Sequence, residues 1–210
     1  MNKQIKQIIN ILSIYGGVIY FIVLLLFTHF LWKLVVDGDL HSQQIAIFGK
    51  DLTTQFHSLS TFTAKIVHWF VRLFPNTDDF LIEDTHLYFR YGGFIVNLIW
   101  GCTSVKQLYI FIVIMAFYKG PWKKKLWYIP LGCVILWIYN IIRIALICYL
   151  TIGHPERFDF LHEGLLRYIY YGLIFLLWMV WEEKFVDSST LKLSKNTPTK
   201  SPKGDFVTAW

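Results

Sequence analysis

Four long apolar runs alternate with polar segments along this chain of 210 residues. The runs cover residues 8–36, 102–118, 126–150 and 164–181. A helix needs about 20 mostly apolar residues to cross a bilayer, and a backbone in lipid must satisfy its own hydrogen bonds. The pattern therefore predicts an all-α integral membrane protein, a helical bundle of about four transmembrane helices.

The segments between these runs are mixed in character. Residues 56–74 combine apolar positions with His57, Lys65, His68 and Arg72. This stretch is compatible with an interfacial amphipathic helix, a re-entrant segment or a weak span. Residues 37–55 are polar, and residues 75–84 are acidic and rich in turn formers. Residues 87–100 are aromatic and β-branched around a Gly-Gly pair, which indicates a short hairpin or an irregular loop.

Lysines beside the apolar runs predict the topology. The short loop 119–125 contains four lysines, and more follow in the tail after residue 181. Cytoplasmic loops carry an excess of Lys and Arg, so this loop and both termini are expected in the cytoplasm. Counting spans then places the start of run 102–118, the end of run 126–150 and the loop 151–163 together on the outer face of the cytoplasmic membrane.

The chain divides into four predicted regions. Residues 1–36 form a retained membrane anchor, because the first run is too long for a signal-peptide core and has no small-residue cleavage site. Residues 37–101 form an outer-face region that includes 56–74. Residues 102–184 form a three-helix membrane core. Residues 185–210 are rich in Ser, Thr, Pro and Lys and are expected to be a disordered cytoplasmic tail.

Composition narrows the class of protein further. The chain is 55% hydrophobic and 19% aromatic with a net charge of +6, which is too apolar for a soluble domain. The positive residues cluster beside apolar runs rather than in a basic stripe, so no nucleic acid is expected as a partner. An odd number of cysteines, with no C-x-x-C motif and no paired histidines, indicates neither a structural disulfide nor a metal or other cofactor.

Cys102, Arg143 and His162 are the candidate catalytic residues, because each lies at or near the outer end of a different apolar run. A helix that starts at Cys102 would lower the pKa of the thiol through its N-terminal dipole, with Lys106 one turn further on, as a nucleophile requires. The alternative is a small residue that eases the start of the helix. Cys133 and Cys148 lie within one run and are expected in the core.

Arg143 lies inside a span, where a charge is costly and by default a functional candidate. It would stabilise a thiolate or an oxyanion, with Asn140 on the same face as a partner for its guanidinium. The alternative is a structural arginine that reaches the outer interface. His162 is suited to acid–base chemistry, or else is an ordinary interfacial histidine.

Other charged side chains in the outer loop are expected to have structural roles. His154 ranks below His162 as an acid–base group, because Gly153-His154-Pro155 is typical of a turn. Glu163 and Arg167 have the spacing of a favourable ion pair on a helix.

Residues 97–183 resemble the exosortase/archaeosortase family of membrane transpeptidases. Three short blocks carry the resemblance: Asn97-Leu-Ile-Trp-Gly-Cys102-Thr-Ser, Asn140-Ile-Ile-Arg143-Ile and Phe160-Leu-His162-Glu-Gly164. The chain departs from larger members in having few spans before the first block, and in having Glu where many members carry Asp after the histidine.

The resemblance implies a nucleophile at Cys102, an electrostatic stabiliser at Arg143 and an acid–base group at His162. Asn97 and Asn140 are candidates for substrate binding. The implied partners are membrane-anchored proteins with a C-terminal sorting signal, which consists of a short motif, a transmembrane helix and a basic tail. The alternative function is a non-catalytic scaffold in a polysaccharide or secretion assembly, and no pattern indicates the oligomeric state.

Overall fold

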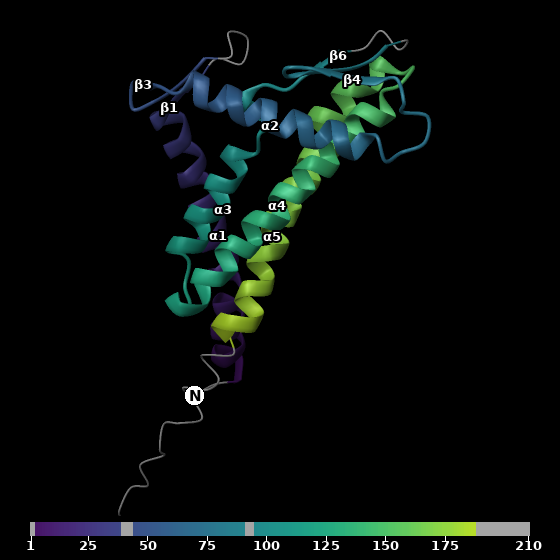
Figure 1. The fold of residues 1–210 in the computed structure, drawn as a ribbon. Coiled ribbons are helices and arrows are strands. Elements are labelled where there is room, and N and C mark those ends of the chain that lie inside the picture. The colour runs from purple at the N-terminus through teal and green to yellow at the C-terminus, as the bar shows by residue number, and fades with distance from the viewer. Residues whose placement is uncertain (1–2, 39–43, 91–94, 188–210) are drawn as a thin grey trace, which may run out of the picture.

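The computed structural model describes residues 3–38, 44–90 and 95–187 (Figure 1). Five α-helices dominate it, joined by two small antiparallel sheets and four short helical turns. In chain order the elements are α1 (Lys3–Val35), β1 (Val36–Gly38), β2 (Ile45–Ile47), β3 (Lys50–Asp51), α2 (Thr53–Val71), β4 (Phe80–Glu83), β5 (His86–Phe89), β6 (Ile95–Asn97), η1 (Trp100–Cys102), α3 (Val105–Phe117), α4 (Trp122–Leu150), η2 (Pro155–Arg157), η3 (Phe160–Leu165), α5 (Leu166–Trp181) and η4 (Glu182–Asp187).

The predicted helical membrane protein is confirmed. Within the described residues, three helical stretches are long and apolar enough to cross a membrane: Gly16–Val35, Trp122–Leu150 and Pro155–Val186. The helix between the first two, α3, has only 13 residues and starts at Val105 rather than at 102. At 1.5 Å per residue it is about 20 Å long, shorter than the apolar core of a bilayer. It packs between α1 and α4.

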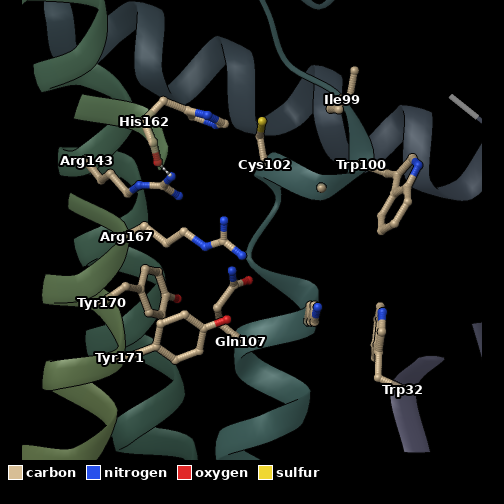
Figure 2. Close-up of a pocket in the computed structure, with 12 residues that line it drawn as sticks. Trp32, Ile99, Trp100, Cys102, Gln107, Arg143, His162, Arg167, Tyr170 and Tyr171 are labelled. Atoms are coloured by element: carbon tan, nitrogen blue, oxygen red, sulfur yellow. Dashed lines mark hydrogen bonds between the residues drawn. The ribbon is translucent and has the colours of Figure 1, made fainter. Parts of the chain in front are cut away.

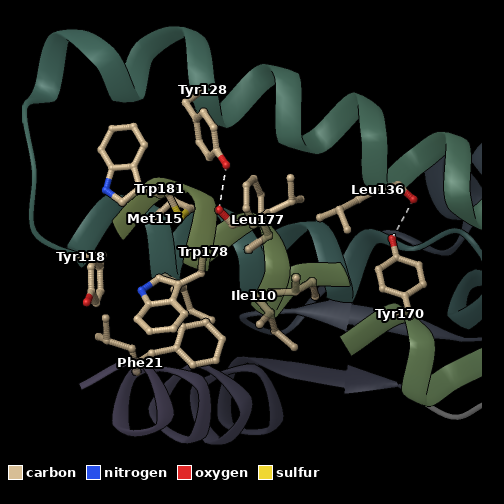
Figure 3. Packing of buried hydrophobic residues seen from close by; sticks show 14 residues of the cluster. Phe21, Ile110, Met115, Tyr118, Tyr128, Leu136, Tyr170, Leu177, Trp178 and Trp181 are labelled. Carbon is tan, nitrogen blue, oxygen red and sulfur yellow. Dashed lines mark hydrogen bonds between the residues drawn. The ribbon is translucent and has the colours of Figure 1, made fainter. Parts of the chain in front are cut away.

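Aromatic side chains fill the centre of the bundle (Figure 3). Trp178 and Trp181 of α5 lie among residues of α1, α3 and α4, and the ring of Phe21 in α1 packs at a tilt against Trp178, with centroids 4.6 Å apart. Buried hydroxyls use main-chain acceptors: Tyr128 donates to the carbonyl of Leu177 at 2.7 Å. The bundle therefore combines a large apolar area with hydroxyls that bond main-chain carbonyls, while the buried indole N–H of Trp178 has no partner among the described residues.

The lysine-rich loop contains a structural residue. Lys125 is buried, and its Nζ donates to the carbonyl of Ala116 at 2.9 Å and to that of Tyr118. These carbonyls belong to the end of α3, where helical partners are missing. One of the four lysines that predicted a cytoplasmic loop thus caps a helix instead of facing the membrane surface.

Most of residues 56–74 belong to helix α2, which is not one of the three candidate membrane spans, so the weak span is not supported. The helix does not run alongside the long helices but lies across their end, together with the two sheets (Figure 1). Its buried face, which includes Ala64, Val67 and Val71, packs against the second sheet and against Ile144 and Cys148 near the end of α4. The burial of Cys148 agrees with its predicted core position.

The second sheet is larger than the hairpin expected at 87–100. It has the order β4-β5-β6, so it begins at Phe80 within the stretch that the sequence indicated as turn. Acidic side chains face outward while Phe80 and Leu87 are buried under α2. This alternation over four residues is too short to distinguish from a turn by sequence alone. The predicted disordered tail falls largely on residues 188–210, outside the described residues.

Candidate active site

A cavity of about 250 Å³ lies at the end of the bundle that carries α2 and the sheets (Figure 2). Its lining comprises Trp32, Ile99, Trp100, Gly101, Cys102, Lys106, Gln107, Arg143, His162, Arg167, Tyr170 and Tyr171. The three candidate catalytic residues are all among them. They come from η1, α4 and η3, so the fold brings together side chains that are 60 residues apart in sequence, from 102 to 162.

Cys102 is held at the end of a tight turn. Its backbone N–H donates to the carbonyl of Ile99 at 2.9 Å, and the N–H of Thr103 donates to that of Trp100 at 3.2 Å. Ser104 follows in the left-handed conformation, with φ of 58°. This residue separates the turn from α3, so Cys102 is not the first residue of that helix, contrary to the expectation from sequence.

The pKa of the Cys102 thiol was expected to be low, and this expectation is wrong. Burial raises the pKa of the thiol, while the backbone hydrogen bond from Ile99 and the positive charge of Arg143 oppose the rise without reversing it. The side chain is half-buried in the cavity wall rather than placed on an open helix terminus. A neutral thiol is therefore the resting form near neutral pH.

Asn140 has a different partner from the one expected. Its Nδ2 donates to the carbonyl of Cys102 at 2.8 Å, and only 1% of the residue is exposed. It does not bond the guanidinium of Arg143 in the described contacts. Asn140 therefore fixes the backbone of the candidate nucleophile to α4, which ties two of the three site elements together.

Arg143 links the other pair of elements. It is 7% exposed, and its Nη2 donates to the carbonyl of His162 at 2.8 Å. Its buried Nε has no hydrogen-bond partner within the described part of the chain. This N–H is therefore an unsatisfied buried donor, and it is the positive charge of the guanidinium that Arg143 brings to the cavity wall.

His162 is oriented by an aromatic ring. Its imidazole stacks on Phe158 with ring centroids 5.1 Å apart and planes 9° from parallel. Figure 2 shows the imidazole of His162 and the thiol of Cys102 pointing into the same space. The η3 segment is a π-type turn, and Gly164 within it has non-helical angles (φ −91°, ψ −110°). This break lets the loop turn His162 toward the cavity before α5 begins.

The other candidate residues named from the sequence are His154, Glu163 and Asn97. His154 does not line the cavity, and its Nδ1 lies 2.9 Å from the carboxylate of Glu156 in an exposed pair. The Glu163 side chain lies outside the described side chains, and the break at Gly164 interrupts the helical register on which its predicted pairing with Arg167 depends. Asn97 also lies outside the cavity, where its Oδ1 accepts from the Thr85 hydroxyl at 3.0 Å.

Several lining residues were not anticipated as parts of the site. Trp32 comes from α1, which the sequence indicated only as an anchor, and Gln107, Tyr170 and Tyr171 read as ordinary helix residues. No sequence motif marks these residues, so their place in the cavity wall is seen only in the packed structure. No group of three or more His, Cys, Asp or Glu suited to a metal occurs in the described ranges.

A comparison with models of known protein families gives a match. The family model described as transmembrane exosortase matches residues 4–181. Searches of the curated proteins and of the solved structures found no match. Because the family match runs from the start of α1 to the end of α5, the chain belongs to the transmembrane exosortase family.

Proposed function

We propose that this protein is a membrane-embedded cysteine transpeptidase or protease that cleaves the C-terminal sorting signal of exported proteins through a thioester on Cys102. Its partners would be membrane-anchored substrates that end in a short motif, a transmembrane helix and a basic tail. The observation that supports this most directly is the convergence of Cys102, Arg143 and His162 on one cavity. A thiol, a buried cation and an imidazole suffice for acyl transfer.

The raised pKa of Cys102 decides how the first step begins. A neutral thiol is a poor nucleophile, so its proton must leave as the sulfur attacks. His162 takes that proton while Sγ of Cys102 bonds to the scissile carbonyl carbon. Negative charge then develops on the carbonyl oxygen, and the positive charge of Arg143, which lines the same cavity, would stabilise it.

The intermediate collapses when the C–N bond breaks. The proton held by His162 passes to the leaving amine, which departs with the transmembrane part of the signal. The substrate is now a thioester on Cys102. An amine or hydroxyl of an acceptor, or water, gives a proton to His162 and attacks the thioester carbon. The departing thiolate recovers that proton, which restores the resting site.

The proposed orientation has the site on the outer face of the cytoplasmic membrane. The lysine-rich segment 119–125 joins α3 to α4 at the end of the bundle away from the cavity (Figure 1). Lysines mark the cytoplasmic side, so this arrangement supports an outward-facing site with both chain ends in the cytoplasm. A sorting signal that has crossed the membrane would meet the cavity there.

Co-expression with a protein that ends in a motif, a transmembrane helix and a basic tail tests the function. Cys102→Ala should abolish processing and leave the protein folded in the membrane, because one small side chain is removed from a cavity wall. Cys133→Ala, a matched change within α4, should process normally. Processing by the Cys102→Ala protein would overturn the mechanism and favour the non-catalytic scaffold.

A further inference from the structure

Two cations besides Arg143 line the cavity beside Cys102. Lys106 belongs to the first turn of α3 and is half-buried, and Arg167 belongs to the first turn of α5. Figure 2 shows the side chain of Arg167 extending from α5 across the cavity toward α3. Arg167 and Lys33, the latter near the end of α1, both repel Lys106 electrostatically. Like charges from three helices thus converge at one edge of the cavity.

No carboxylate offsets these charges among the side chains that are described. The ion pairs there join His57 to Asp84 and His154 to Glu156, and none of these four lines the cavity. Cations in membrane helices are costly and usually face a cavity in which they serve a ligand. A bound anion would remove the mutual repulsion of Lys106, Arg167 and Lys33.

The start of α3 adds a second attraction for an anion. Ser104 precedes the helix but makes no side-chain capping bond, because its hydroxyl donates to the carbonyl of Thr103 at 2.7 Å. The first N–H groups of a helix and its dipole favour negative charge. Gln107, one residue beyond Lys106, also lines the cavity, and its buried Oε1 has no partner in the described chain.

The position of this cluster indicates the source of the anion. Lys33, Lys106 and Arg167 lie where α1 ends and where α3 and α5 begin, next to the ring of Trp32. Tryptophan rings and helix ends mark the headgroup level of a bilayer, and basic pockets between membrane helices accept lipid headgroups. We propose that Lys106 and Arg167, with Lys33 at the rim, bind the phosphate group of a lipid headgroup.

Thermal melting of the purified full-length protein in a nonionic detergent tests this proposal independently of any processing activity. The additives are phosphatidylglycerol, an uncharged galactosyl lipid and inorganic phosphate. Phosphatidylglycerol should raise the melting temperature of the wild type, and the galactosyl lipid should raise it much less. The double variant Lys106→Gln/Arg167→Gln should need at least tenfold more phosphatidylglycerol for the same shift.

Control variants distinguish the loss of the proposed phosphate site from the loss of any two positive charges. Lys119→Gln/Lys123→Gln removes the same charge from the exposed loop at the other end and should respond like the wild type. Arg167→Lys keeps the charge and should retain most of the response. The double variant without lipid should melt no lower than the wild type, since its removal of like charges relieves repulsion.

Each alternative outcome has a defined meaning. An equal response to inorganic phosphate, lost in the double variant, supports the phosphate subsite with the free ion as its source. An unchanged phosphatidylglycerol response in the double variant overturns the proposal. If neither phosphatidylglycerol nor inorganic phosphate raises the melting temperature of the wild type, the proposal is also overturned.

Discussion

Asn140 offers the sharpest test of how the site is built. Its Nδ2 donates at 2.8 Å to the carbonyl of Cys102 in a buried position. Asn140→Leu keeps the number and branching of the side-chain heavy atoms but removes the donor, which leaves that carbonyl unsatisfied. Such a loss costs about 1–3 kcal/mol in free energy of unfolding. The Cys102 turn would also be released from α4, and a displacement of about 1 Å in a reacting group lowers rates by about 100-fold.

The comparison variant is Tyr128→Phe, which removes a 2.7 Å hydrogen bond to Leu177 in the bundle core, away from the cavity. It should cost about 1 kcal/mol and leave processing unchanged. Both variants are measured by chemical or thermal unfolding in detergent and by the rate of substrate processing per folded molecule. Asn140→Leu should process about 10–100-fold more slowly than Tyr128→Phe. Equal processing rates for the two folded variants would refute a positioning role for Asn140.

Two further predictions follow from the packing and from the thiol. A Cβ on Gly132 would lie 2.3 Å from Cζ of the buried Phe111, so Gly132→Ala should lower the free energy of unfolding by about 1–3 kcal/mol. A Cβ on Gly172 would meet no neighbouring atom within 4 Å, so Gly172→Ala should not destabilise the protein. Equal losses of stability in the two variants would contradict this packing account. Because burial raises the pKa of Cys102, its alkylation rate should still increase with pH where the rate of a free cysteine, with a pKa of ~8.5, has become constant. Arg143→Gln should move the midpoint of this pH dependence to a higher pH, because the positive charge of Arg143 lowers the pKa of the thiol. A midpoint below that of a free cysteine would contradict a raised pKa for Cys102.

The end of the bundle at which the site lies could be predicted from the sequence, because it depends only on where the apolar runs end. Once the runs are counted, Cys102, the end of α4 and His162 must lie at the same end of the bundle. The described structure has them there, around one cavity. Run lengths and lysine positions carry this information without any knowledge of which helix faces touch.

The contacts inside the site depend on helix rotation and on small breaks, which periodicity does not reveal. Ser104 in a left-handed conformation delays the start of α3, and this moves Cys102 off the helix terminus that would have lowered its pKa. Arg167 likewise lines the cavity, just after the break that Gly164 makes in the helix. Neither change alters the hydropathy of its segment, so neither was visible in the sequence.

The two small sheets could not be predicted from the pattern of apolar and polar residues either. Strands β1 to β6 are two to four residues long, and a period of two cannot be recognised over so few positions. Their stability comes from packing: a Cβ on Gly38 of β1 would lie 2.6 Å from the ring of Trp100, two residues before Cys102. The first sheet therefore contacts the turn that holds the candidate nucleophile, a relation that no local propensity contains.

The depth of Arg143 in α4 has a consequence for substrate choice. This residue lies seven positions before Leu150, so the candidate site lies about 10 Å along α4 from the end of that helix. A substrate helix in the same bilayer has its own height fixed by its apolar length. Because an extended linker advances about 3.3 Å per residue, adding a few residues between motif and helix carries the susceptible bond past the thiol. For the proposed reaction, the enzyme would thus measure distance from the membrane, and linker length would select the bond together with the motif.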